Sequence, residues 1–108
     1  NFIVTIDFNK IQSITSVENT IRLEPLDQKW ASFGWHVIRV DGHDHAALHQ
    51  AYSEAIAARG QGKPIVVIAD TVKGKGVSFM EGDVLWHYRT ARGEEYDAAV
   101  KELEAQKL

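Results

Sequence analysis

The sequence predicts an α/β protein in which helices cover both faces of a parallel sheet. Short runs of β-branched residues alternate with helical segments along the 108 residues, and this alternation is typical of parallel sheets. The apolar run Ile65–Ala69, preceded by Pro64, suits a strand that is buried on both faces. After Asp44, apolar residues recur at three- and four-residue spacing, as expected for a helix with one face on a core.

The first third of the chain predicts a strand, a loop and a helix. A strand is expected over Phe2–Asp7, and the polar stretch Asn9–Glu24 is expected to be a loop. A helix is expected over Leu26–Phe33, because Pro25 lies near its first turn and Gly34 lies where a C-cap belongs. Three aromatic residues around the end of this helix are expected in the core: Trp30, Phe33 and Trp35.

The middle of the chain predicts a second strand followed by a long helix. The strand is expected over Trp35–Asp41, and Asp44 is a suitable N-cap for a helix that runs to Arg59. Gly60 and Gly62 end this helix. Its expected buried stripe consists of Leu48, Ala51, Tyr52, Ala55 and Ile56.

The last third predicts a buried strand, a glycine-rich turn and a final helix. The strand is expected over Ile65–Thr71 and the helix over Glu94–Leu108. Acidic Glu94 and Glu95 near the start of the helix, and Lys107 near its end, suit the helix dipole. The expected apolar face consists of Tyr96, Val100 and Leu103.

Composition allows one small domain and excludes several classes of function. The formal net charge of −3 gives no reason to expect a nucleic-acid partner, and the lack of cysteine excludes disulfides and thiolate metal sites. No apolar run approaches the ~20 residues of a membrane span. The chain enters a strand directly at Asn1 without an initiator methionine, so we expect it to be a segment of a longer polypeptide.

Polar residues follow each expected strand, which predicts a ligand site. Asp7 and Asn9 follow the first strand, Asp44 follows the second, and Lys73–Gly76 follows the third. Because the carboxyl ends of parallel strands share one edge, these groups should converge where α/β folds bind their ligands. In the sequence Lys73-Gly74-Lys75-Gly76 the glycines allow close approach of the backbone to a ligand, and the lysines favour an anion.

Taken together, these segments resemble the transketolase family, in the later part of its domain that binds thiamine diphosphate and a divalent metal. The resemblance covers nearly the whole chain, with the motifs in the family's order and at similar spacings. The motifs are Asp7-Phe8-Asn9-Lys10-Ile11, Phe33-Gly34-Trp35-His36, Val40-Asp41-Gly42-His43-Asp44, Thr71-Val72-Lys73-Gly74-Lys75-Gly76 and Trp86-His87. The resemblance implies that residues 1–108 form the C-terminal portion of such a domain, within a thiamine diphosphate-binding fold.

The resemblance also implies roles for four residues. Asn9 would ligate the metal through its side-chain oxygen and Ile11 through its backbone carbonyl, and oxygen ligands suit Mg²⁺ or Ca²⁺. Lys73 would lie near the diphosphate, and His87 would reach the cofactor and the sugar substrate. Taken singly, each residue also has a structural interpretation: Asn9 as a turn residue, Lys73 as a solvated lysine and His87 as a surface histidine.

Three features set this chain apart from a complete family member. Many members follow the histidine with glycine and lysine, whereas this chain has Tyr88-Arg89, so Tyr88 is expected to narrow the pocket. The family's Gly-Asp-Gly motif, whose aspartate is another metal ligand, does not occur in these residues and is expected upstream. The glutamate that activates the cofactor belongs to another domain, which a partner subunit supplies in the family. Residues 1–108 are therefore expected to be inactive alone.

The function implied by the resemblance is transfer of a two-carbon ketol unit from a ketose phosphate to an aldose phosphate. The enzyme would be cytoplasmic, would act in the pentose phosphate pathway, and would form a homodimer or an assembly of split subunits. Two alternatives stay open: another thiamine diphosphate enzyme, of the deoxyxylulose-phosphate synthase or ketoacid dehydrogenase type, and a non-catalytic α/β module. The identity of the sugar and the arrangement as one chain or a split pair are left open.

Overall fold

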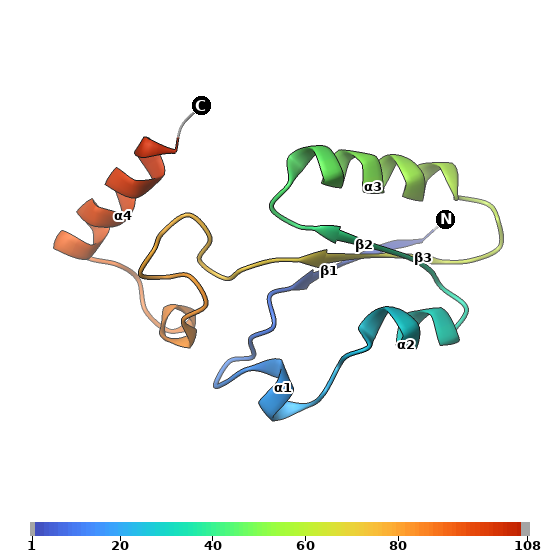
Figure 1. Cartoon of the computed structure of the whole chain (residues 1–108), viewed down its shortest axis with the longest axis horizontal. Helices are drawn as coiled ribbons and strands as arrows, with labels where there is room; N and C mark the ends of the chain where they lie inside the picture. The colour runs from blue at the N-terminus through green and yellow to red at the C-terminus, as the bar shows by residue number, and fades with distance from the viewer. Residues whose placement is uncertain (1, 107–108) are drawn as a thin grey trace. The chain divides into compact units, whose positions relative to one another are not determined.

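A computed structural model describes residues 2–106, and the chain divides into two compact units (Figure 1). The first unit comprises Asn1–Asn9 and Ile21–Thr71, and the second comprises Lys10–Thr20 and Val72–Leu108. Each unit is therefore built from two separate stretches of sequence. Among the described residues, no helix has the length and apolar character needed to cross a membrane.

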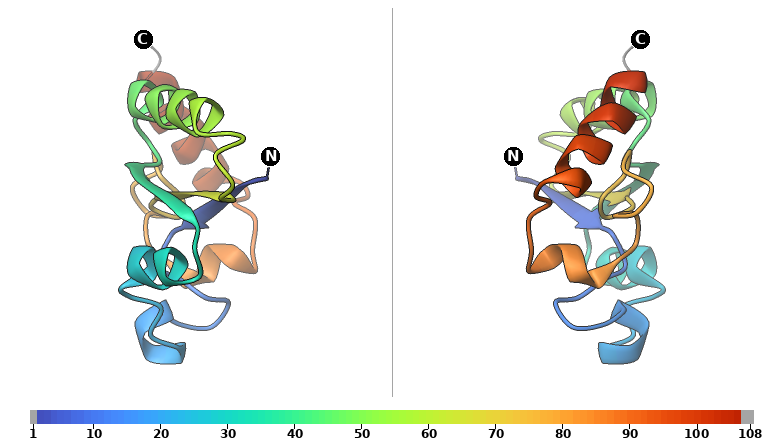
Figure 2. Two further views of the ribbon diagram at one scale, coloured as in Figure 1. Left: turned by 90° about the vertical axis from the view of Figure 1, so that its right-hand side faces the viewer. Right: turned by 90° about the vertical axis from the view of Figure 1, so that its left-hand side faces the viewer.

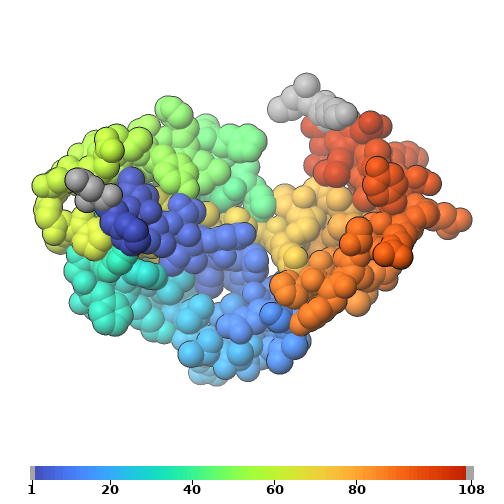
Figure 3. All heavy atoms as spheres, turned by 180° about the vertical axis from the view of Figure 1, so that it is seen from behind, coloured from blue at the N-terminus to red at the C-terminus, as the bar shows by residue number. Residues whose placement is uncertain are grey.

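The first unit is organised around a three-stranded parallel sheet, which confirms the predicted fold class. Its strands are β1 (Ile3–Phe8), β2 (His36–Asp41) and β3 (Ile65–Asp70), each within one residue of its predicted ends. Their spatial order is β1-β3-β2, so the last strand in sequence occupies the centre of the sheet. The space-filling view shows the dark blue atoms of β1 at the surface, as expected for an edge strand (Figure 3).

The core of the first unit forms where β3 is covered by helix α3 (His45–Ala57). Ile65 and Val67 of β3 pack in one buried cluster with Ala51 and Ala55 of α3. The small alanine side chains allow the helix to approach the sheet closely. Asp44 caps the helix as predicted, because its carboxylate accepts hydrogen bonds from the backbone N–H groups of the first turn at 2.9 and 3.0 Å.

Helix α2 (Leu26–Ser32) lies on the opposite face of the sheet from α3 (Figures 1 and 2). Val66 and Ile68 of β3 alternate with the residues that face α3, and both are fully buried. Leu26 at the start of α2 is also buried. The predicted placement of helices on both faces of the sheet is therefore confirmed.

Several details of the predicted core are wrong. Phe33 is 81 % exposed, because it forms the C-cap of α2 and the chain turns there into Gly34 with φ 84°. Trp30 and Trp35 are half-buried and meet edge to face, with their ring centroids 4.6 Å apart. Ile56 of the expected α3 stripe is 53 % exposed, so the alanines of that helix make most of its core contact.

The second unit contains the remaining helices: α1 (Val17–Thr20), the 3₁₀ helix η1 (Val84–His87) and α4 (Glu94–Ala105). The expectation of an unbroken loop over Asn9–Glu24 is therefore wrong, because α1 interrupts it. In α4, Ala99 is buried, whereas Tyr96 and Leu103 of the predicted apolar face are 58 % and 48 % exposed. The predicted end of this helix at Lys107 and Leu108 lies outside the described residues.

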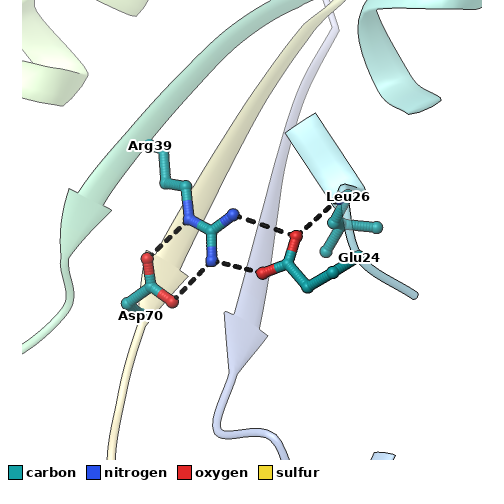
Figure 4. A network of polar contacts seen from close by, with 4 residues as sticks. All are labelled: Glu24, Leu26, Arg39 and Asp70. Carbon is teal, nitrogen blue, oxygen red and sulfur yellow. Dashed lines mark hydrogen bonds and ion pairs between the residues drawn. The ribbon is translucent and has the colours of Figure 1, made fainter. Parts of the chain in front are cut away.

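An arginine on β2 joins the end of the central strand to the start of α2 (Figure 4). The Arg39 guanidinium donates two hydrogen bonds to the Asp70 carboxylate, at 2.7 and 3.0 Å, and two to Glu24, at 2.7 and 3.2 Å. Glu24 also accepts a hydrogen bond of 2.7 Å from the backbone N–H of Leu26. Paired donation from a guanidinium to a carboxylate fixes orientation as well as distance.

This network changes the acidity of Glu24. The hydrogen bond from Arg39, followed by the backbone hydrogen bond from Leu26, lowers the pKa of the Glu24 carboxyl below its ordinary value of 4.5. The carboxylate is therefore stabilised in its charged form by the folded structure. Since 45 % of the Glu24 side chain is exposed, solvent screening keeps its contribution to stability small.

Replacement of a buried β3 residue should destabilise the chain far more than the same replacement on an exposed helix face. Ile68→Ala should lower the free energy of unfolding by about 2–5 kcal/mol, because it leaves a cavity at a fully buried position. The matched control Ile56→Ala removes a side chain that is 53 % exposed and should change that free energy by less than about 0.5 kcal/mol. Urea unfolding followed by circular dichroism measures both values. Similar losses in the two variants would contradict the central role of β3.

The Arg39 network should make stability depend on acid pH. The pKa of Glu24 is lowered on folding, so its contribution is present above pH 4.5 and is lost as the pH falls through its folded-state pKa. Glu24→Gln should therefore weaken the fall in unfolding free energy between neutral pH and about pH 3. Urea midpoints at both pH values would show this difference. An unchanged pH dependence in the variant would mean that Glu24 contributes nothing through its charge.

Candidate active-site segments

Strands β1 and β3 end side by side, at the edge of the sheet where a ligand site is predicted. Phe8 pairs with Asp70 in the parallel register, and the Thr71 backbone N–H donates to the Phe8 carbonyl at 3.3 Å. The Thr71 hydroxyl donates a further hydrogen bond to the Asp7 carboxylate. Asn9 and Thr71 therefore leave the sheet from neighbouring positions.

The turn after β2 closes against the same edge and requires a glycine there. The Gly42 backbone N–H donates to the Asp70 carbonyl at 2.8 Å. A Cβ atom at Gly42 would lie 2.4 Å from Thr71 Cγ2 and 3.1 Å from Ala69 Cβ. The His43 N–H donates to the Asp41 carboxylate at 2.9 Å and completes the turn. The three strand ends thus lie at one edge of the sheet in the first unit, whereas Lys73–Gly76 belong to the second unit, and the predicted convergence of their polar groups stays a prediction.

The segment that follows β1 turns sharply after Asn9 and forms a closed loop. Asn9 is half-buried, and Lys10 adopts the left-handed conformation with φ 64°, which is uncommon for a residue other than glycine. The Lys10 carbonyl accepts a hydrogen bond of 2.9 Å from the Val17 N–H, and Ile11 forms an antiparallel bridge with Ser16. We call residues Lys10–Val17 the Lys10 loop. The Ile11 backbone is held within this short loop.

The glycine-lysine segment after β3 forms a compact turn in the second unit. Gly74 and Gly76 have φ values of 76° and 97°, so they supply turn conformations that are disfavoured for other residues. The Gly82 N–H donates to the Lys73 carbonyl at 2.9 Å and closes the turn. The Lys73 side chain has no hydrogen-bond or ion-pair partner among residues 2–106, whereas Lys75 Nζ lies 3.4 Å from Glu81 Oε1.

The predicted histidine lies at the end of η1, in a segment held by its neighbours. Asp83 caps η1 by accepting a hydrogen bond of 2.8 Å from the Leu85 N–H, and Trp86 Nε1 donates to the Phe79 carbonyl at 3.0 Å. His87 is exposed, and its ring meets that of Tyr88 edge to face, with centroids 4.9 Å apart. His87 thus presents an exposed imidazole on a turn that is held by Asp83 and Trp86.

The chemistry of the predicted ligand atoms fits a hard divalent cation. The side-chain amide of Asn9 and the backbone carbonyl of Ile11 both offer oxygen, which Mg²⁺ and Ca²⁺ prefer. Among residues 2–106 there is no group of three or more His, Cys, Asp and Glu side chains that would hold a metal by themselves. Asn9 belongs to the first unit, and Ile11, Lys73 and His87 belong to the second. A complete metal shell would need further ligands from outside these segments.

Sequence reasoning did not predict three of the contacts that organise these segments. Thr71 pairs with Asp7, Arg39 holds Asp70, and Tyr88 donates a hydrogen bond to the carbonyl of Ser13 in the Lys10 loop. Each contact joins residues more than 30 positions apart in sequence. Thr71 and Tyr88 were visible in the sequence beside the glycine-lysine turn and His87, but their partners Asp7 and Ser13 were not.

Comparison with known proteins identifies the same family throughout. Residues 1–105 match the family described as the thiamine diphosphate-binding domain of transketolase. The chain is 43 % identical over 98 residues to the 6-deoxy-6-sulfo-D-fructose transketolase subunit SqwG of Clostridium sp. (strain MSTE9), which covers 91 % of the chain and 35 % of that protein. It is 37 % identical over 103 residues to an apulose-4-phosphate transketolase subunit of Actinobacillus succinogenes, covering 95 % of the chain and 36 % of that protein.

The fold agrees with that of a solved transketolase. The structure of transketolase from Campylobacter jejuni superposes with a TM-score of 0.73 at 24 % sequence identity, over 98 % of this chain and 16 % of that one. At this identity the likeness shows a shared α/β fold. The chain thus spans about a third of the length of the two curated relatives, at 35 % and 36 %.

Two glycines with similar backbone conformations should respond differently to alanine. A Cβ at Gly74 (φ 76°) would lie 2.5 Å from the Met80 carbonyl oxygen, whereas a Cβ at Gly82 (φ 70°) would meet nothing within 4 Å. Gly82→Ala should therefore lower the free energy of unfolding by only the left-handed penalty of about 1–2 kcal/mol. Gly74→Ala should lose a further 1–3 kcal/mol or so, because the backbone of the turn must move. Equal losses, measured by urea unfolding, would show that the close approach to Met80 is unimportant.

Proposed function

Since the chain belongs to the transketolase family, we propose that it forms the later part of a thiamine diphosphate-binding domain in an enzyme that transfers a two-carbon ketol unit. The observation that carries the proposal is the pairing of β1 with β3 through Phe8 and Asp70. This pairing makes the segments that begin at Asn9 and Thr71 leave the sheet from neighbouring strands. Such an edge is where α/β folds bind anionic cofactors.

In this proposal the chain holds the metal and the diphosphate. The Asn9 side-chain oxygen and the Ile11 carbonyl would hold Mg²⁺ or Ca²⁺, which would supply positive charge against the cofactor's diphosphate. Lys73 places a positive charge beside the same group, and its side chain has no competing partner among residues 2–106. The left-handed conformation of Lys10 supports the metal-binding role of Asn9 and Ile11, because it turns the chain between these two proposed ligand residues.

The cofactor, when bound, supplies the nucleophilic carbon that carries the two-carbon unit. The protein contributes position and charge, which is its usual share in such reactions. His87 is exposed on a turn that Asp83 and Trp86 hold in place. We assign to its imidazole a hydrogen bond to a phosphate or sugar oxygen, or proton transfer near neutral pH.

The site needs residues beyond this chain. Two relatives are named as transketolase subunits, and the chain spans 35 % and 36 % of their lengths. We infer that these residues act together with further sequence and with a partner subunit, as a homodimer or a split-subunit pair, and have no activity by themselves. Sugar phosphates are the proposed substrates, and we propose a cytoplasmic enzyme of pentose phosphate metabolism.

Replacement of Asn9 should weaken cofactor binding through the metal. In the full-length protein, Asn9→Ala should reduce the affinity for thiamine diphosphate at fixed Mg²⁺ by at least about tenfold, because one metal ligand is lost. The matched control Asn19→Ala removes an exposed asparagine side chain on α1 and should leave that affinity unchanged. Isothermal titration calorimetry measures both. The metal assignment is wrong if Asn9→Ala binds the cofactor as tightly as the unmodified protein.

A further inference from the structure

Tyr88 connects two parts of the second unit that are far apart in sequence. Its hydroxyl donates a hydrogen bond to the backbone carbonyl of Ser13, 75 residues earlier. Ser13 lies in the Lys10 loop, two residues after Ile11, and Tyr88 directly follows His87. One side chain therefore links the loop that carries a proposed metal ligand to the turn that carries the proposed substrate histidine.

Both ends of this link are well supported by their surroundings. The Lys10 loop is closed by the Val17–Lys10 hydrogen bond and by a second bond of 2.7 Å from the Gln12 N–H to the Thr15 carbonyl. The Tyr88 backbone N–H donates to the Leu85 carbonyl at 3.0 Å, so the residue continues η1 in a fixed conformation. The Tyr88 hydroxyl is therefore a side-chain link between two segments that are each held by their own backbone hydrogen bonds.

The Tyr88 side chain contributes little to the hydrophobic core. It is 62 % exposed, and its ring contacts the exposed ring of His87 edge to face. Tyr96 on α4 is exposed to nearly the same degree, at 58 %, but its hydroxyl has no hydrogen-bond partner among residues 2–106. The two tyrosine hydroxyls thus differ in the bond to Ser13, which makes removal of the Tyr96 hydroxyl a matched control.

We propose that Tyr88 is a positioning residue that locks the Lys10 loop to the turn carrying His87. The inference rests on the proposed function, because the Lys10 loop matters for cofactor binding only if its Ile11 carbonyl is a metal ligand. Holding the Ile11 carbonyl in place before the cofactor arrives lowers the ordering cost of binding. Tyr88 itself need not touch the metal, the cofactor or the substrate.

The test compares Tyr88→Phe with Tyr96→Phe in the full-length protein with its partner. Hydrogen exchange without cofactor reports directly on the Lys10 loop: its amides should exchange about two- to tenfold faster in Tyr88→Phe, as expected for loss of one hydrogen bond. Titration with thiamine diphosphate at fixed Mg²⁺ should show an affinity weakened by a similar factor. Tyr96→Phe should match the unmodified protein in both measurements, and the thermal midpoints of the two variants should agree.

Several outcomes would overturn the inference. Unchanged exchange in Tyr88→Phe would show that the bond does not hold the loop, and faster exchange with unchanged affinity would show that the loop does not matter for binding. A thermal midpoint that falls in step with affinity would indicate a purely structural role. Asn9→Ala distinguishes failure of the proposed function from failure of this inference. Cofactor binding of normal affinity in Asn9→Ala refutes the proposed metal role. Weak binding in Asn9→Ala together with normal binding in Tyr88→Phe refutes the positioning role of Tyr88 alone.

Discussion

The central strand β3 is the constraint on which the first unit depends. It pairs with β1 on one side and β2 on the other, and residues Ile65–Ala69 are buried throughout. A strand with pairing partners on both sides and helices on both faces has one favourable register, because a slip by one residue would reverse the direction of every side chain. The ends of all three strands follow from that register, and so do the starting points of the segments proposed to bind the cofactor.

At the end of β3, ionic hydrogen bonds follow the buried apolar residues. Asp70 is the first polar residue after five apolar ones, and Arg39 from β2 holds its carboxylate. The same guanidinium reaches Glu24, so the start of α2, the second strand and the end of β3 share one network (Figure 4). Removal of Arg39 would leave the Glu24 and Asp70 carboxylates, which repel each other, without the cation that they share. The network thus supports the strand end from which Thr71 and the glycine-lysine turn continue.

Local sequence patterns predicted the helices and strands well. They failed for features that depend on contacts between residues far apart in sequence. The β-branched run at Ile65 and the Asp44 N-cap carry their signals within a few residues, and both predictions are confirmed. The strand order and the exposure of Phe33 depend on how the elements pack, which no local pattern reveals. The network around Arg39 has the same origin. The motifs pointed to the family, whereas the roles of Asn9, Ile11, Lys73 and His87 stay predictions, because a ligand's contacts are not encoded in a strand or turn signal.

The division of the second unit into two stretches has a consequence for how the protein forms. Residues Lys10–Thr20 are synthesised early, but they share a compact unit only with residues from Val72 onward. The first unit, by contrast, has all its strands once Asp70 has left the ribosome. Contacts across such long sequence separations form slowly, because the intervening chain must first be ordered. We therefore expect the contacts between residues Lys10–Thr20 and the residues from Val72 onward to form after the sheet of the first unit during biosynthesis.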